Sequence, residues 1–206
     1  MSAAVVSSVG NRAHFTLRTH RGDVLPLFAE RWFGQANEVD EEVLDRALEP
    51  VLDVGCGPAR HTVALVTRGV LAFGVDIAGS AIRLAVDRGA PVLHRSVFDP
   101  LPGEGTWGTV LLLDGNVGIG GDPQALLTRT RALLQRCGRV LVETEGPGIK
   151  SKAMLVAVEE NGRPGEWFAW MRVGIDVLET VAPAAGFEIR DLWSREARWF
   201  AHLDAR

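Results

Sequence analysis

Two glycines separated by one residue, Gly55 and Gly57, follow the apolar stretch Val51–Val54, and a helical pattern over His61–Arg68 comes next. This order predicts a strand, a tight turn and a helix, the opening unit of a parallel α/β sheet. Glycines at such a turn let a ligand approach the backbone closely, and the helix N-terminus attracts polar groups. The turn is therefore the first candidate for a ligand-binding site.

Acidic residues stand at the ends of the strands predicted after this turn. Asp76 ends the second strand, Asp99 follows the third, and Asp114 ends the fourth, directly before Gly115-Asn116. Because parallel strands end at one edge of the sheet, where ligands bind in open α/β folds, we expect these side chains near the glycine turn. Each alone could be an ordinary cap or turn residue, since Asp is frequent at both. Their joint placement favours a binding site.

Alternating elements position these residues. We expect strands at about 51–54, 70–76, 92–95, 109–113 and 140–144, and helices at 40–48, 61–68, 80–88 and 123–137. Towards the two ends of the chain we expect a hairpin of Phe15–Thr19 with Val24–Leu27, extended segments at 153–159 and 167–173, a helix at 175–185, and closing strands at 187–192 and 198–203. The pattern predicts an α/β fold with a mostly parallel central sheet, helices on both faces and an antiparallel C-terminal strand.

Composition limits the function. The 206 residues are 47% hydrophobic, enough for one compact domain with a full core, and the net charge of −4 argues against a nucleic-acid partner. Cys56 and Cys137 fit neither a disulfide framework nor a metal-ligand spacing, so no metal is expected. No apolar run reaches the ~18 residues of a membrane span, and Met1–Gly10 lacks the features of a signal peptide. We expect a cytoplasmic protein, monomeric or homodimeric, without a membrane partner.

The stretch Asp53-Val54-Gly55-Cys56-Gly57, followed in order by Asp76 and Asp99, resembles the class I S-adenosylmethionine-dependent methyltransferases. The resemblance covers Val51–Glu145, and Ala59 stands where that family often has a further glycine. It implies a single-domain, Rossmann-like fold and S-adenosylmethionine as cofactor. Its expected parts are an N-terminal cap at 1–49, a cofactor-binding core at 50–145, and a sheet-completing, acceptor-side part at 146–206.

The resemblance also implies roles for individual residues. The backbone of Gly55, Cys56 and Gly57 would pass close to the methionine portion, and Asp53 would supply negative charge near its ammonium group. The two oxygens of Asp76 can accept both ribose hydroxyls. At the other end of the cofactor, the adenine would contact Asp99 through its amino group and lie against Ile77 or Phe98.

The acceptor side is less defined. In the family the strand end at Asp114 borders the transferred methyl group, so Asp114 and Asn116 would orient the acceptor or the methionine end. Methyl transfer can depend mainly on positioning and desolvation, and a base is needed only for an acceptor atom of high pKa. The candidates for such a catalytic group are His61, Asp114, Asn116 and Glu145.

Six tryptophans occur in a chain that has no tyrosine. Trp32, Trp167, Trp170 and Trp199 lie outside the cofactor core, where they suit either the flat walls of a small-molecule pocket or ordinary core packing. Trp32, which follows Arg31, and Trp167 are the candidate substrate residues.

Two other functions stay open. A nicotinamide dinucleotide would favour G-x-G-x-x-G, but the last position is Arg60, and Asp53 would face the pyrophosphate unfavourably. A non-catalytic module could bind S-adenosylmethionine or S-adenosylhomocysteine without transferring a methyl group. We expect a methyltransferase that acts on a small molecule at an O, N, S or C atom, because the chain offers no basic surface for a nucleic acid.

Overall fold

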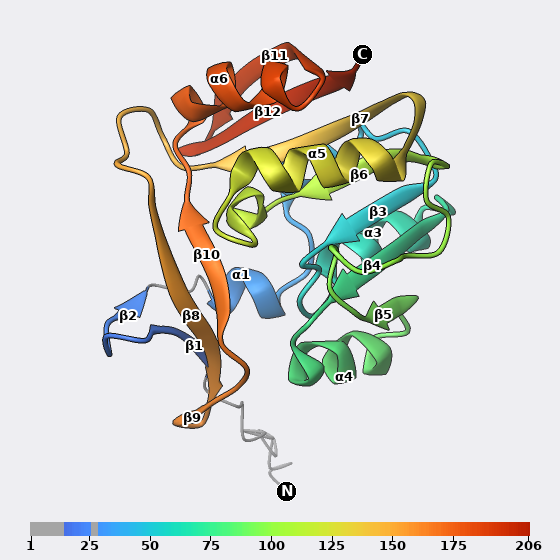
Figure 1. Cartoon of the computed structure of the whole chain (residues 1–206). Coiled ribbons are helices and arrows are strands. Elements are labelled where there is room, and N and C mark those ends of the chain that lie inside the picture. Colours follow the sequence, from blue (N-terminus) through green and yellow to red (C-terminus); the bar gives the residue numbers. More distant parts are fainter. Residues whose placement is uncertain (1–14, 26–28) are drawn as a thin grey trace, which may run out of the picture.

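The structure, a computed structural model, describes residues 15–25 and 29–206. Its main sheet has seven strands in the order β11-β12-β7-β6-β3-β4-β5 (Figure 1). Their bounds are β3 Val51–Val54, β4 Ala72–Asp76, β5 Val92–His94, β6 Trp107–Leu112, β7 Leu134–Thr144, β11 Phe187–Arg195 and β12 Arg198–Ala205. Strands β3 to β7 pair in parallel, and β12 and then β11 continue the sheet antiparallel. This confirms the predicted mostly parallel sheet with an antiparallel C-terminal end.

Helices cover both faces of this sheet, and the alternation of side chains along its strands explains how. Leu52, Val110 and Val142 point to the face covered by α5 (Pro123–Leu133) and α6 (Leu178–Ala184). Val51, Leu111 and Leu141, each next to one of these residues in the chain, pack against α2 (Glu38–Leu44) and α3 (Arg60–Thr67). Because both faces are buried, the central strands read as continuous apolar runs. A further helix, α4 (Gly79–Asp87), follows β4.

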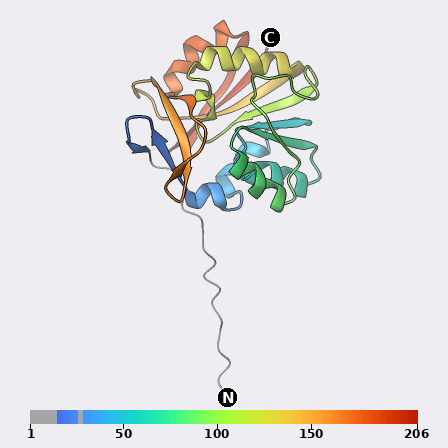
Figure 2. The ribbon, with the colours of Figure 1, turned by 60° about the horizontal axis from the view of Figure 1, so that its bottom comes forward.

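A second sheet stands at the carboxyl edge of the main sheet (Figures 1 and 2). It has the order β10-β8-β1-β2, with β9 paired to β8, so it joins the N-terminal hairpin to the region after β7. Its strands are β1 Phe15–Thr19, β2 Val24–Leu25, β8 Lys152–Glu160, β9 Arg163–Pro164 and β10 Phe168–Arg172. All pairings within it are antiparallel, which confirms the predicted hairpin and the predicted pair of extended segments. Of the expected strand Val24–Leu27, residues 26–27 lie outside the described ranges.

The largest error in the sequence-based elements concerns the end of α5. The pattern predicts a helix to Cys137, but the helix ends at Leu133 and β7 begins at Leu134. Leu134 pairs with Trp107 of β6 ahead of a register shift, and Cys137 has φ 63°. Pairing with β6 therefore overrides the local helix propensity. Helix α2 begins at Glu38, earlier than predicted, because Asn37 starts it with a capping box, and it ends at Leu44 instead of at residue 48.

Three short helical segments complete the chain. They are α1 Ala29–Phe33, before α2, and the single turns Asn116–Gly118 and Ile175–Val177. Over residues 15–25 and 29–206, no helix combines the length and apolarity that a membrane crossing requires.

Candidate functional site

A cavity of about 830 Å³ lies between the carboxyl edge of the main sheet and the second sheet. Its volume falls within the range of about 300–1,000 Å³ that is typical of small-molecule sites. The main sheet lines it with residues at strand ends, namely Gly55, Gly57, Asp76, Asp114, Glu143 and Glu145. The opposite wall comes from α1 and the second sheet, with Leu17, Arg31, Trp32, Val158, Phe168, Trp170 and Arg172. The strand-end residues that the sequence singles out therefore meet largely where expected.

Asp76 presents its carboxylate to the cavity at the end of β4. Its Oδ2 accepts a hydrogen bond from Gly57 N at 2.8 Å, and its Oδ1 accepts one from Ala78 N at 2.7 Å. Burial raises the pKa of Asp76, although these two N–H groups act in the opposite direction. A carboxylate has about four acceptor sites, so each oxygen keeps one for a ligand hydroxyl.

The glycine turn is closed by Asn116. Gly55 has φ 68°, and a Cβ on it would lie 2.7 Å from Nδ2 of Asn116. That Nδ2 donates to the carbonyl oxygens of Val54 and Gly55, each at 2.9 Å. Asn116 thus ties the loop after β6 to the turn after β3. This geometry fits a side chain that orients the turn, not one that transfers a proton.

The two residues expected beside an adenine, Ile77 and Phe98, line the cavity. The ring of Phe98 packs over Gly120, where a Cβ would lie 2.8 Å from its Cζ. Asp99 does not line the cavity; it lies in the exposed turn after Phe98, and its carbonyl accepts a hydrogen bond from Nη2 of Arg129 at 2.7 Å. This position gives no support to the expected contact of Asp99 with the adenine amino group.

Three other predicted residues are buried beside α3 and do not line the cavity. Asp53 is 1% exposed and accepts a hydrogen bond from Oγ1 of Thr62 at 2.9 Å, and burial raises its pKa. The Cys56 thiol is also buried, which raises its pKa well above the usual value. His61 is 3% exposed, with Nε2 3.4 Å from Oδ1 of Asp40. The structure therefore gives no support to the expected contact of Asp53 with an ammonium group or to a catalytic role of His61, because neither residue lines the cavity.

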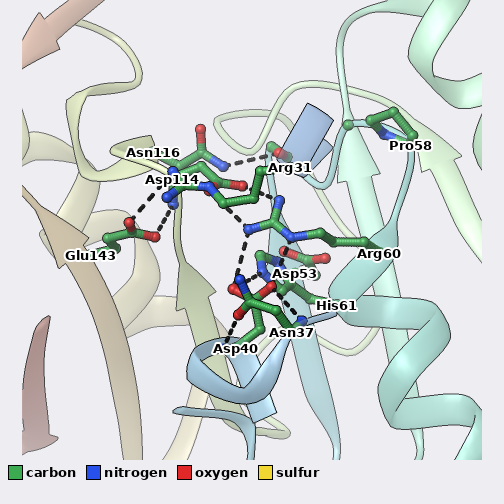
Figure 3. Close-up of polar contacts among 12 residues, drawn as sticks. Arg31, Asn37, Asp40, Asp53, Pro58, Arg60, His61, Asp114, Asn116 and Glu143 are labelled. Carbon is green, nitrogen blue, oxygen red and sulfur yellow. Dashed lines mark hydrogen bonds and ion pairs between the residues drawn. The ribbon is translucent and has the colours of Figure 1, made fainter. Parts of the chain in front are cut away.

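Asp114 does reach the cavity, where two arginines hold its carboxylate (Figure 3). Arg60 donates to Oδ2 from Nη1 at 2.5 Å and to Oδ1 from Nη2 at 2.9 Å, and Nη2 of Arg31 lies 3.1 Å from Oδ1. Burial favours the neutral acid, but Arg60 outweighs it and lowers the pKa of Asp114 to about 2. A carboxylate so acidic is a poor proton acceptor, so this environment favours a fixed negative charge at Asp114 over a base.

These contacts belong to a closed arrangement of alternating charges. We call it the ion-pair ring; in order around it come Asp40, Arg60, Asp114, Arg31, Glu143 and Arg198. Besides the contacts above, Nε of Arg60 lies 3.1 Å from Oδ2 of Asp40, and Nη2 of Arg31 lies 3.6 Å from Oε1 of Glu143. Arg198 closes the ring with two hydrogen bonds of 2.8 Å to Glu143 and a contact of 2.9 Å to Asp40.

The ion-pair ring is buried and electrically balanced. Three carboxylates face three guanidinium groups, and the exposed fractions of these side chains run from 0% for Asp40 to 21% for Arg31. Although burial opposes its ionisation, hydrogen bonds from His61 and Arg60 hold the pKa of Asp40 far below its usual value. The ring joins α1, α2 and α3 to the ends of β6 and β7 and to β12, and so fixes the N-terminal helices against the edge of the sheet.

On the acceptor side, the structure selects Trp32 and Trp170 as lining residues and leaves out Trp167. Trp167 precedes β10 and is 46% exposed, whereas Trp170 lies within β10. Residues of one parity along a strand share a face, so Phe168 and Trp170 line the cavity together. Of the two predicted substrate residues, Trp32 lines the cavity and Trp167 does not, and Trp170 lines it in addition.

Sequence reasoning missed the arginines of the site. In the sequence, Arg60 reads as a departure from the dinucleotide pattern, but it lies close after the glycine turn, which places it at the sheet edge. Arg31 has no signal beyond its position next to Trp32. Arg198 gives no local signal, because its partners Asp40 and Glu143 are far away in the chain.

Comparisons with known proteins place this geometry in a fold family. No protein-family model matches the sequence, and no curated protein matches it. Among solved structures, an S-adenosylmethionine-dependent methyltransferase from Bacteroides fragilis, in complex with S-adenosyl-L-homocysteine, has a TM-score of 0.76 at 18% identity, over 93% of this chain and 88% of that chain.

Two further structures agree. The amino pentose methyltransferase CalS10 from Micromonospora echinaspora, with S-adenosylmethionine bound, has a TM-score of 0.61 at 19% identity, over 85% of this chain and 94% of that one. The Burkholderia thailandensis 1,6-didemethyltoxoflavin-N1-methyltransferase has a TM-score of 0.55 at 21% identity, over 75% of this chain and 70% of that chain. The chain therefore has the fold of the class I S-adenosylmethionine-dependent methyltransferases, as the sequence resemblance implied.

Proposed function

We propose that the protein is an S-adenosylmethionine-dependent methyltransferase that acts on a small molecule. The observation that carries this proposal is the position of Asp76, whose carboxylate lines the cavity directly beside the Gly55–Gly57 turn. Both oxygens of Asp76 keep acceptor sites for a ribose diol, and Ile77 and Phe98 lie in the same cavity for the adenine. When bound, S-adenosylmethionine would supply a methyl group whose carbon the sulfonium makes electrophilic.

The chain's own residues then have distinct tasks. The turn at Gly55 and Gly57 would take the methionine portion, and Asp114 would border it as a fixed anion on the acceptor side. The N-terminal segment and residues 146–206 contribute the wall opposite the sheet edge, so the acceptor would enter between the two sheets. This arrangement supports catalysis by positioning and desolvation, with Glu145 as the remaining predicted candidate for a proton acceptor.

The size of the cavity supports a small-molecule acceptor, as do the names of two structural relatives. One of these is called an amino pentose methyltransferase, and the other a methyltransferase of 1,6-didemethyltoxoflavin. We further propose that the protein acts in the cytoplasm, as a monomer or homodimer without a nucleic-acid partner, in keeping with its net charge of −4.

Calorimetric titration with S-adenosylhomocysteine tests the assignment of Asp76. Asp76→Ala should weaken binding by roughly 2–3 kcal/mol, the scale of hydrogen bonds to a charged group. Asp76→Asn, which keeps one acceptor oxygen, should weaken binding less than Asp76→Ala does. Asp99→Ala serves as the matched control, because the structure leaves that side chain outside the cavity. Unchanged affinity in Asp76→Ala, with a normal melting curve, would remove the ribose role.

A further inference from the structure

Strand β10 forms a wall of the cavity with a regular pattern of side chains. Phe168, Trp170 and Arg172 occupy alternate positions and all line the cavity. Residues two apart in a strand lie on one face about 6–7 Å from each other. The wall therefore presents two aromatic groups followed by a cation, at a spacing close to the width of one aromatic ring.

Trp170 is held beside the loop that begins at Asp114. A Cβ on Gly115 would lie 3.4 Å from Cζ2 of Trp170, so the indole packs directly on that glycine. The backbone around it is fixed as well, since Trp170 forms an isolated bridge with Ile119 and Gly120 N donates to the carbonyl of Ala169 at 2.9 Å. A fixed, half-buried indole that faces a cavity is a natural stacking surface for a flat ligand.

Arg172 forms an ion pair with Glu145 at the same wall. Nε of Arg172 donates to Oε1 of Glu145 at 2.9 Å, and the two side chains are 42% and 40% exposed. The backbone of Glu145 is fixed, because its N–H donates to the carbonyl of Val173 at 2.8 Å. Unlike the carboxylates of the ion-pair ring, this pair stays accessible to the cavity and offers an acceptor oxygen next to guanidinium donors.

We infer that the acceptor is a flat aromatic or heteroaromatic molecule that stacks on Trp170. One edge of this molecule carries an N–H next to a carbonyl, as in a lactam, and faces Glu145 and Arg172. The inference rests on the proposed function. Glu145 accepts from the N–H of that edge, and the guanidinium of Arg172 donates to its carbonyl. Stacking favours planar rings over saturated ones, and the polar edge fixes how the acceptor lies against Asp114 and the methionine end.

Three simple probes separate these requirements. Carbostyril is flat and has the lactam edge, quinoline is flat without it, and valerolactam has the edge without an aromatic ring. Their binding to the full-length protein saturated with S-adenosylhomocysteine is measured by ligand-observed NMR. Carbostyril should bind at least about fivefold more tightly than either of the others. The difference from valerolactam reflects the usual strength of aromatic contacts, and the difference from quinoline reflects that of hydrogen bonds. Equal binding of all three would overturn the inference.

Variants assign the effect to residues. Trp170→Leu should weaken carbostyril binding by roughly fivefold or more, and Trp170→Phe should restore most of it. Trp167→Leu is the matched control, because that indole lies outside the cavity three residues earlier, and it should bind carbostyril as the wild type does. Arg172→Leu should reduce the preference for carbostyril over quinoline, because only the hydrogen bond to Glu145 then remains for the lactam edge. Equal losses in Trp170→Leu and Trp167→Leu, or an unchanged preference in Arg172→Leu, would contradict the assignment.

Titration of S-adenosylhomocysteine on the same samples separates the two proposals. If it binds and the probe pattern is absent, the inference about the acceptor fails while the proposed function stands. If it does not bind, the proposed function fails and this inference fails with it.

Discussion

Replacing Arg60 by methionine would test whether the ion-pair ring holds the site together. Arg60 is 5% exposed and contacts both Asp40 and Asp114. Methionine keeps most of the apolar volume but leaves the two buried carboxylates with one arginine partner each, Arg198 for Asp40 and Arg31 for Asp114. The variant therefore isolates the charge of Arg60 from its packing.

The loss of unfolding free energy expected in Arg60→Met can be worked out in two ways. Breaking a buried ion pair by removing one partner costs about 3–5 kcal/mol. Independently, a pKa of Asp114 of about 2, against about 3.9 in unfolded chains, corresponds to about 2–3 kcal/mol. Because each carboxylate keeps one arginine, we expect Arg60→Met to lower the free energy of unfolding by about 3 kcal/mol at pH 8. For a chain of this length that lowers Tm by about 6–12 °C.

The loss should depend on pH. In the wild type, the low pKa of Asp114 contributes stability that is complete above about pH 4 and disappears as the pH falls through about 2. In Arg60→Met, Asp114 loses the strongest attraction that lowers its pKa while its burial remains, so its pKa rises and protonation in the folded state relieves part of the penalty as the pH falls. The difference between wild type and variant should therefore be larger at pH 8 than at pH 5.

Urea unfolding followed by circular dichroism at both pH values measures this difference. Arg60→Lys keeps the positive charge and should lose less unfolding free energy than Arg60→Met. The double variant Arg60→Met/Asp114→Asn should recover part of the loss, because Asn tolerates the positive φ of 56° at this position and carries no charge. A loss below about 1 kcal/mol that is equal at pH 5 and pH 8 would refute the stabilising role of the ion-pair ring.

Three further predictions concern the walls of the site. Gly118→Ala should disrupt packing against β10, because its Cβ would lie 1.8 Å from a backbone oxygen of that strand. Gly79→Ala is the control, because its Cβ would meet only ordinary contacts from 3.5 Å outwards. A thermal melt compares the two variants, and equal Tm values would contradict the structure. Asn116→Ala should cost about 1–3 kcal/mol in urea unfolding by leaving two carbonyl groups unpaired, and an unchanged midpoint would show that they find other donors. In the native protein a thiol reagent should titrate Cys137, which is exposed, and spare Cys56, whose pKa burial raises; fast reaction of both thiols would place Cys56 at the surface.

The main sheet could be predicted because its signals are local. Apolar runs and acidic strand ends recur at short intervals. The predicted start of α5 at residue 123 is confirmed, and Asp122 caps the helix by accepting a hydrogen bond from Ala125 N at its Oδ1. The end of α5 could not be predicted, since it depends on pairing between Leu134 and a strand that lies earlier in the chain. Local propensity carries no information about such a partner.

The same distinction applies to the site. Asp76 and Asp114 were found because each ends a strand, and strand ends converge at one edge. Arg198 was missed because its contacts with Asp40 and Glu143 depend on how β12 pairs with β7. For the tryptophans, the sequence indicated the region but not the strand parity that turns Trp170 toward the cavity.

The most direct test of the central proposal is a parallel calorimetric titration of the purified protein with S-adenosylmethionine, S-adenosylhomocysteine, NAD and NADP. The proposed function predicts binding of the two adenosyl ligands and no binding of the nicotinamide ligands. Binding of NAD or NADP instead would contradict the methyltransferase proposal and make the cavity beside Asp76 a dinucleotide site.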